Sequence, residues 1–436
     1  MMKHGFLVVA WLLAHNAFAL DGDIDMHDPS TVIHSEGRYY SYGTGKGLPI
    51  LSSADGWRWH HAGSVMDALP GGSPGPQVLA KGGNNTWAPD VIHLGDKYFL
   101  YYSAPGTQPK SAIGLLTSTT LNPDSPDYRW QDGGPVVWSD GEEDSNAIDP
   151  GVFLDRNDGT LWLSYGSYFG YIRLVQLDPA TGQRLHAELK PFEIAINSEA
   201  STIIQHDDWY YLLVTHGSCC VGSNSSYNIR MGRSHNVKGP YLDNMGIDML
   251  QGGGKLLLGS GGRHIGAGHF GLLDLGDGVQ KFSLHYEADL DRGGRSVLDL
   301  LPLWWRDGWP VAGEHIAAGS WQIESLRTGT ALELAVEGVP VGGLRRPDRT
   351  FNGIIEDQQV AQVSTAWPNT AIKVRMAPYL LQAQQQWRLV PVSEAGGYPG
   401  EPYFRISISG SERTLAATPD EELVVEPVYT GAAQQL

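Results

Sequence analysis

The chain contains 436 residues and carries a formal net charge of −18, from 30 Lys and Arg against 48 Asp and Glu. This balance argues against a nucleic-acid-binding protein, because phosphate binding needs clustered positive charge. Only 18% of the residues are charged and 41% are hydrophobic, so the composition is that of a globular chain rather than a disordered one. The 55 Gly, 26 Pro, 14 Trp and 19 Tyr residues favour aromatic strands joined by many turns, which predicts an all-β fold. The length suggests two domains, or one large domain with an appendage.

The N-terminus has the features of a secretory signal peptide. Lys3 and His4 precede an apolar run over residues 6–13, and residues 17–19 (Ala-Phe-Ala) match the small-residue pattern of a cleavage site. The apolar run is too short to cross a bilayer comfortably, which makes a membrane anchor the weaker alternative. We therefore expect residues 1–19 to be removed and the mature protein to be secreted or periplasmic, with no membrane partner.

A weak internal repeat follows. Each copy starts with a short polar or acidic motif, and an aromatic strand such as residues 39–42 (Tyr-Tyr-Ser-Tyr) comes about ten residues later. The starts are separated by 62, 59, 50 and 70 residues, a length that suits one four-stranded blade. Five such copies within residues 20–318 predict a five-bladed β-propeller. A β-sandwich is the alternative, but it gives no reason for this period.

Radial symmetry would bring distant residues of the repeat together. In a propeller the innermost strand of each blade lines the central channel, so equivalent positions of all copies meet at one end of the axis. We expect the polar residue at each start to occupy such a position, which would gather five side chains around one pocket. These residues are Asp28, Asp90, Asp149, Glu199 and His269.

Residues 319–436 are interpreted as a second, smaller β domain. They contain short strands such as residues 332–335 and 403–407, and residues 385–387 (Gln-Gln-Trp) resemble the Q-x-W element of ricin-type β-trefoil modules. That resemblance implies a β-trefoil-like, carbohydrate-binding module. A β-sandwich is the alternative for this domain.

The two cysteines of the chain, Cys219 and Cys220, are adjacent. An exported chain meets oxidising conditions, under which this pair can close as a vicinal disulfide. Two buried thiols are the alternative, and the sequence leaves both open.

The carboxylates at the repeat starts would supply the groups for glycoside hydrolysis. Carboxylates gathered at one axis cannot all share one pKa: an exposed one stays ionised as a base, while a desolvated one keeps its proton as an acid. Such a pair is what glycoside hydrolysis requires. Trp87 offers an aromatic face for a sugar ring, and Arg230 offers a fixed positive charge for a hydroxyl or a carboxylate. Each also has a structural alternative, blade packing for Trp87 and a purely structural ion pair for Arg230.

Several short motifs occur in a fixed order between residue 24 and about residue 300. They are H-D-P-S at 27–30, W-A-P-D at 87–90, the stretch from 113–115 through 121–123 to 127–130, N-A-I-D-P at 146–150, L-V-Q-L-D-P at 174–179, S-E-A at 198–200 and N-I-R-M-G-R-S at 228–234. Their common order and spacing resemble glycoside hydrolase family 43, and within it the α-1,5-L-arabinanases.

The resemblance implies a five-bladed propeller and an inverting hydrolase that cleaves α-1,5-linked L-arabinofuranosyl bonds. By position, Asp28 resembles the general base that activates water, and Glu199 the general acid that protonates the leaving oxygen. Asp149 resembles the third carboxylate, which orients the acid and tunes its pKa. His269 resembles the family's histidine facing a central calcium ion, whose other ligands are mostly waters.

The expected partner is arabinan or an arabino-oligosaccharide, bound by a monomer that has no nucleic-acid partner. We assign Trp87, Asn146 and Arg230 to substrate binding. Without the resemblance, Asp28 and Asp149 would be interpreted as turn residues, because both precede proline. Two other functions stay open: an exo-acting α-L-arabinofuranosidase or β-xylosidase on the same fold, and a sugar-binding propeller without catalysis.

Overall fold

The computed structural model contains two compact units, Leu20–Glu314 and His315–Leu436. It describes residues 20–313 apart from 108, 143–144, 262–263 and 277–278. In the second unit it describes residues 315, 319–321, 323, 330–334, 372–378, 383–398, 401–409, 413–417 and 423–427. The predicted signal peptide, residues 1–19, lies outside the described residues.

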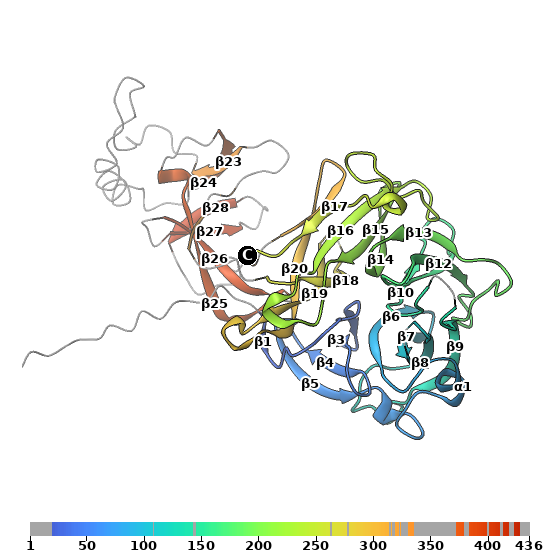
Figure 1. Ribbon diagram of the computed structural model, residues 1–436. Helices are drawn as coiled ribbons and strands as arrows, with labels where there is room; N and C mark the ends of the chain where they lie inside the picture. The colour runs from blue at the N-terminus through green and yellow to red at the C-terminus, as the bar shows by residue number, and fades with distance from the viewer. Residues whose placement is uncertain are drawn as a thin grey trace, which may run out of the picture. The chain divides into compact units, whose positions relative to one another are not determined.

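The first unit is a five-bladed β-propeller, as the sequence predicts. Five sheets follow one another around a ring, and each contains four antiparallel strands in chain order (Figure 1). The first strands of the blades contact one another around the axis. They are β2 (Ile33–Ser35), β6 (Trp87–Leu94), β10 (Gly151–Leu154), β14 (Glu199–His206) and β18 (Gly268–Asp274).

The remaining strands extend each blade outward. The second strands are β3 (Arg38–Tyr42), β7 (Lys97–Pro105), β11 (Leu161–Tyr165), β15 (Trp209–His216) and β19 (Gln280–Ala288). The third strands are β4 (Pro49–Ser53), β8 (Ser111–Ser118), β12 (Tyr171–Leu177), β16 (Asn228–Ser234) and β20 (Arg295–Arg306). The outer strands are β5 (Arg58–Ser64), β9 (Gln131–Ser139), β13 (Phe192–Ile196), β17 (Lys255–Leu258) and β21 (Trp309–Ala312).

The N-terminal segment joins the first blade to the last. Strand β1 (Asp21–Gly22) pairs in parallel with β5 of the first blade. The residues that follow reach the fifth blade, where Leu298 N–H donates to the Ile24 carbonyl at 2.8 Å and Met26 N–H donates to the Ser296 carbonyl at 3.2 Å. The ring is therefore closed by a short segment that bonds both blades.

The hydrophobic core consists of layers between adjacent blades. Along β7, Tyr98, Leu100 and Tyr102 pack toward the first blade, whereas Phe99 and Tyr101 pack toward the third. Successive side chains of a strand point to opposite faces of the sheet, so a strand covered on both faces is apolar throughout. This explains why the aromatic strands of the repeat are continuous hydrophobic runs rather than alternating ones.

Helices are few and short among the described residues. The α-helix is α1 (Pro76–Lys81), which has Pro at its first position and lies against β8 and β9. The 3₁₀ turns are η1 (Met66–Ala68), η2 (Gly222–Asn224), η3 (Met249–Gln251), η4 (Leu290–Arg292) and η5 (Ala383–Gln385). Within the described part of the chain, no helix has the length and apolar character needed to span a membrane.

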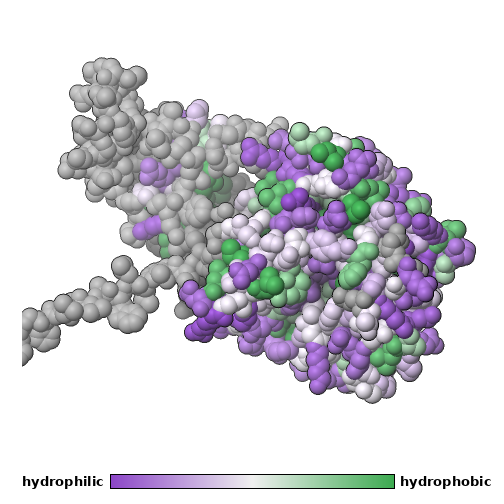
Figure 2. Space-filling view, viewed as in Figure 1, coloured by the Kyte–Doolittle hydropathy of each residue, from purple (hydrophilic) through white to green (hydrophobic). Residues whose placement is uncertain are grey.

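The face of the propeller that is shown in Figure 2 is largely polar. In the view of Figure 2, hydrophilic residues cover most of this unit, and apolar residues form small separate groups. This distribution fits a domain whose apolar side chains pack between its blades.

The described part of the second unit is one seven-stranded antiparallel sheet in the order β22-β25-β26-β27-β28-β24-β23. Trp387 of the Q-x-W element is fully buried, and its indole N–H donates to the Leu332 carbonyl at 2.9 Å. Gln385 is also buried and donates to the Glu333 carboxylate at 2.9 Å. These two residues therefore hold this unit together. The strands are β22 (Gly319–Trp321), β23 (Ala331–Leu334), β24 (Ile372–Ala377), β25 (Trp387–Tyr398), β26 (Glu401–Ile408), β27 (Arg413–Ala417) and β28 (Leu423–Pro427).

Asp90 links three blades near the axis. Its carboxylate is almost fully buried and accepts the backbone N–H groups of Thr31, at 3.0 Å, and Val152, at 2.9 Å. These contacts give Asp90 a structural role, because its carboxylate joins the backbones of the first and third blades.

Asp90→Ala should therefore destabilise the propeller. It leaves two backbone donors without their acceptor, and each such loss costs about 1 to 3 kcal/mol, so we expect a loss of roughly 2 to 4 kcal/mol. Asp90→Asn, which keeps one acceptor oxygen, should lose less. Urea unfolding followed by tryptophan fluorescence measures both, and an unchanged stability of Asp90→Ala would contradict the linking role.

Candidate active site

Five equivalent residues at the start of the first strands share a left-handed backbone. Their φ angles lie between 35° and 61°, a region that is costly for L-residues other than Gly and is tolerated best by Asp, Asn and His. Strain of this kind is often found at functional sites. The five residues are Asp28, Ala88, Asp149, Ala200 and His269.

This set corrects the equivalence that we expected from the sequence. In the second blade the equivalent residue is Ala88, and Asp90 lies two residues after it. In the fourth blade the equivalent residue is Ala200, and Glu199 lies one residue before it. The same register shift occurs at the start of β6, β14 and β18, which confirms that Ala88, Ala200 and His269 are equivalent. Asp90 and Glu199 therefore occupy different places in the repeat: the Glu199 carboxylate accepts the Tyr227 hydroxyl, whereas the Asp90 carboxylate accepts the backbone N–H groups of Thr31 and Val152.

The backbone N–H of each left-handed residue is bonded to a side chain of the preceding blade. Ala88 N–H donates to Thr44 Oγ1 at 2.7 Å, and Asp149 N–H donates to Ser103 Oγ at 2.8 Å. His269 N–H donates to Thr215 Oγ1 at 2.9 Å. These acceptors are hydroxyl groups of short side chains at the ends of the second strands. They therefore fix the positions of the site residues along the propeller axis.

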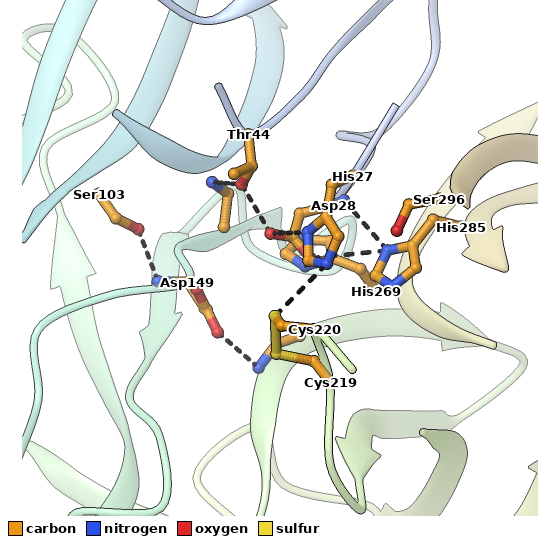
Figure 3. Close-up of polar contacts among 12 residues, drawn as sticks. His27, Asp28, Thr44, Ser103, Asp149, Cys219, Cys220, His269, His285 and Ser296 are labelled. Carbon is orange, nitrogen blue, oxygen red and sulfur yellow. Dashed lines mark hydrogen bonds and ion pairs between the residues drawn. A yellow bond between two sulfur atoms is a disulfide. The ribbon is translucent and has the colours of Figure 1, made fainter. Parts of the chain in front are cut away.

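Asp28 is surrounded by three imidazoles and one hydroxyl (Figure 3). Its Oδ2 lies 2.7 Å from His27 Nδ1 and accepts the Thr44 hydroxyl at 2.6 Å. Its Oδ1 lies 3.5 Å from His269 Nδ1 and 3.6 Å from His285 Nδ1. Both carboxylate oxygens thus have polar neighbours, and the orientation of the group is fixed.

These neighbours keep Asp28 ionised. Burial alone would raise its pKa, but the charge of His27 and the hydrogen bonds from His269 and His27 hold the pKa well below its usual range. Burial lowers the pKa of His285 to about 3, so this imidazole is neutral. Its Nδ1 accepts the Asp28 backbone N–H at 3.1 Å, which places its own proton on Nε2.

The pKa values of Asp149 and Glu199 are raised, whereas that of Asp28 is lowered. Burial and the charges of Glu199 and Asp28 raise the pKa of Asp149 well above its usual range. Burial also raises the pKa of Glu199, assisted by the charge of Asp28, against the hydrogen bond from the Tyr227 hydroxyl. Asp149 Oδ2 accepts the N–H of Ala200 at 3.3 Å, so the two carboxyl groups belong to one connected unit in which the negative charge of either favours protonation of the other.

The residues assigned to substrate binding lie in different places. Trp87 begins β6 next to the left-handed Ala88 and is partly exposed. Asn146 is fully buried, and its amide joins Ser111, at 2.8 Å, to Ser167, at 3.3 Å, so its present contacts are structural.

Arg230 lies on the third strand of the fourth blade. Its Nε donates to Asn228 Oδ1 at 2.9 Å. Burial raises the pKa of Tyr168 to about 12 against the charge of Arg230, whereas burial and that charge together lower the pKa of His216.

Several site residues are missing from the sequence prediction. His27, His285 and Thr44 surround the carboxylate of Asp28, and Tyr227 holds that of Glu199. Only His27 lies in a quoted motif beside a predicted catalytic residue. Tyr227 directly precedes the 228–234 motif, which is the signal that could have identified it.

The cysteines close as a vicinal disulfide in a loop beside the site (Figure 3). Cys220 Sγ lies 3.7 Å from His27 Nε2, so the disulfide contacts the imidazole that bonds Asp28. Of the two alternatives left by the sequence, the structure has the disulfide.

The exposed aromatic side chains of Tyr168 and Phe169 lie between β11 and β12, at the same end of the propeller as the carboxylates. The Tyr168 hydroxyl donates to the Gly217 carbonyl at 2.9 Å, which ties this loop to the disulfide loop.

Taken together, the site joins one ionised carboxylate to a coupled pair of carboxyl groups whose pKa values are raised. One group can take a proton from water while another gives a proton to an oxygen, which is the requirement for hydrolysis of a glycosidic bond by general acid and base.

Several known proteins are similar to the chain. The extracellular exo-α-(1→5)-L-arabinofuranosidase of Cellvibrio japonicus is 35% identical over 328 residues, covering 71% of this chain and 93% of that protein. The extracellular endo-α-(1→5)-L-arabinanase 1 of Bacillus subtilis is 34% identical over 300 residues, covering 65% of this chain and 87% of that protein. The structure of the Cellvibrio cellulosa α-L-arabinanase complexed with arabinohexaose is 33% identical with a TM-score of 0.61, covering 67% of this chain and 98% of that chain.

The sequence model of one family also matches residues 23–310, which is nearly the whole propeller. With its fold and its acid–base site, the chain therefore belongs to glycosyl hydrolases family 43.

Proposed function

We propose that this protein is an exported hydrolase that cleaves the α-1,5 bonds between L-arabinofuranosyl units of arabinan, with inversion. The observation that carries the proposal is the ionised Asp28 at one site with Asp149 and Glu199, whose pKa values are raised. Relatives named as arabinan-degrading and extracellular, at 34% and 35% identity, support the substrate and the export.

In the proposed mechanism, Asp28 and Glu199 act in one displacement. Asp28 accepts a proton from a water molecule as the water oxygen bonds to the anomeric carbon. Glu199 gives its proton to the departing glycosidic oxygen as the bond between that oxygen and the anomeric carbon breaks. Asp149 acts through Glu199: its bond to the Ala200 N–H fixes the backbone beside the acid, and its charge favours the protonated form of Glu199.

Release of arabino-oligosaccharides from debranched arabinan tests the proposal. The purified protein should generate reducing ends from this polymer and from α-1,5-arabinotriose. Hydrolysis of an aryl β-D-xyloside without release from arabinan would instead support the β-xylosidase alternative. Retention on arabinan without any product would support the non-catalytic alternative.

Exo attack is a second candidate, because the relative with 35% identity is named as an exo-acting enzyme. The sizes of the products over time distinguish the two modes on linear arabinan. Mixed oligomers at early times indicate endo attack, and one dominant small product from the start indicates exo attack.

Asp149→Asn should move the alkaline limb of the pH–rate profile to lower pH. Wild-type activity requires protonated Glu199 and is lost as the pH rises through the raised pKa of that carboxyl. Asn removes the neighbouring negative charge that favours protonation, so the pKa of Glu199 falls and the loss begins at lower pH. The profile of kcat/KM against pH measures the limb. An unchanged limb would show that Asp149 does not tune the acid.

We also propose a calcium ion near His269, held mainly through waters. His269 Nδ1 faces Asp28, which leaves Nε2 as the ligand atom. Calcium prefers oxygen ligands, whereas most of the described side chains around Asp28 are imidazoles, so this donor set fits calcium only if water supplies most ligands. When bound, the ion would add positive charge that stabilises the nearby carboxylates. Incubation with EDTA should lower the thermal midpoint and the activity, and calcium should restore both; unchanged values would reject the ion.

A further inference from the structure

An exposed tryptophan lies between two hollows on the side of the propeller. Trp138 is 46% exposed although it is near the end of β9, where its backbone pairs with Ala112 of β8. The hollow toward the third blade has a volume of about 620 Å³, and the hollow toward α1 has a volume of about 530 Å³. Trp138 lines both of them, and each volume lies in the range of small-ligand sites.

The two hollows have polar linings that can bond hydroxyl groups. Arg184 and Glu142 line the hollow toward the third blade, and Gln77 and Gln183 line the hollow toward α1. Guanidinium, carboxylate and amide groups together offer donors and acceptors on both sides of one aromatic ring. A sugar ring has the matching surface, with an apolar C–H face and hydroxyls around its edge, so this combination favours a glycan over an apolar ligand.

The lining groups are held in place. Lys81 Nζ lies 4.3 Å from the centroid of the Trp138 ring, so its charge covers one face of the indole. Gln183 donates to the Gly133 carbonyl at 2.7 Å, which joins the segment after β12 to β9. Because these contacts order the side chains before any ligand arrives, binding would cost less side-chain entropy.

Trp138 also lies at the end of the propeller that carries the carboxylates. The next residue, Ser139, accepts the backbone N–H of Ala147 at 3.0 Å, two residues before Asp149. A polymer that is bound across the site and extends outward along the second and third blades would therefore pass over Trp138.

We propose that Trp138 and its two hollows form a second, non-catalytic binding site for the arabinan polymer. This inference rests on the proposed function for the identity of the glycan. The site would retain long chains near the catalytic carboxylates and would contribute nothing to short substrates that fill only the catalytic site.

Affinity electrophoresis through gels that contain debranched arabinan tests the site. The comparison is made in the Glu199→Gln background, which prevents degradation of the gel polymer. Trp138→Ala should weaken retention by about fivefold or more, as loss of an aromatic contact predicts. Trp138→Tyr should keep most of the retention. Trp304→Ala removes another exposed tryptophan that lines neither hollow, and it should not change retention.

Kinetics in the active background completes the test. Trp138→Ala should raise KM on long arabinan and leave kcat/KM on α-1,5-arabinotriose unchanged, with an unchanged thermal midpoint. Equal retention of Trp138→Ala and Trp304→Ala, or an equal loss on the trisaccharide, would overturn the proposal. Retention in polygalacturonate gels but not in arabinan gels would overturn the choice of glycan. If the unmodified protein fails to cleave arabinan, the proposed function fails, while Trp138-dependent retention would still support the site.

Discussion

Asp28→Ala is expected to lower kcat on α-1,5-arabino-oligosaccharides by about 10⁴-fold, the upper range for loss of a general base. The water that attacks the anomeric carbon would have no group to accept its proton. The loss should be as large for an aryl arabino-oligosaccharide with a good leaving group, because activation of water is needed whatever leaves. Initial rates on both substrates measure the effect.

Added azide provides a positive test of the same variant. Azide needs no deprotonation and can occupy the space left by the Asp28 side chain, so it should restore turnover and yield the β-arabinosyl azide. Asp23→Ala, which removes an exposed carboxylate from the same segment, serves as the control and should retain full activity. Wild-type rates in Asp28→Ala, or rescue in the control variant, would remove Asp28 from the role of base.

Glu199→Gln should lower kcat on arabinan by about 10³-fold or more, because the departing sugar oxygen would leave without a proton. An aryl leaving group of low pKa needs little protonation, so this substrate should lose far less than the polymer. This selectivity separates the acid from the base, since Asp28→Ala affects both substrates. Rates on the two substrates, with circular dichroism to verify folding, provide the measurement.

Glu188→Gln is the matched control for the acid. It changes an exposed glutamate between β12 and β13, and both substrates should be cleaved at the wild-type rate. Equal losses on arabinan and on the aryl substrate in Glu199→Gln would contradict general acid catalysis by this residue.

The fold was predictable because it depends on a period. Strands such as β7 and β15 are apolar on both faces, and the repeat of such strands every 50 to 70 residues is visible in the sequence. The closure of the ring was not predictable, because it depends on backbone bonds from Ile24 and Met26 to a strand some 270 residues later. Neither residue has a side chain that signals this pairing.

The site was predictable in its carboxylates and not in their surroundings. The family resemblance predicted Asp28, Asp149 and Glu199, and the structure brings their charges into one interacting group, but Glu199 and Asp90 do not occupy the repeat position of Asp28. The equivalent residues of these two blades are Ala88 and Ala200, so two of the five copies have no polar side chain at this position from which the repeats could be aligned.

The partners of the carboxylates come from other blades. His285 lies 257 residues after Asp28, in the aromatic strand of the fifth repeat and not at a repeat start, and Thr44 is part of no quoted pattern. Contacts of this kind arise only when the ring closes, so the sequence predicts the carboxylates and the fold supplies the neighbours that set their pKa values.

The stereochemistry of the first product tests the account most directly. Proton NMR during early hydrolysis of an α-1,5-arabino-oligosaccharide distinguishes the anomers of the newly formed reducing end before they interconvert. Attack by a water that Asp28 activates, on the side opposite the departing oxygen, predicts the β anomer first. Initial appearance of the α anomer would mean retention, and it would contradict the assignment of Asp28 as base and Glu199 as acid.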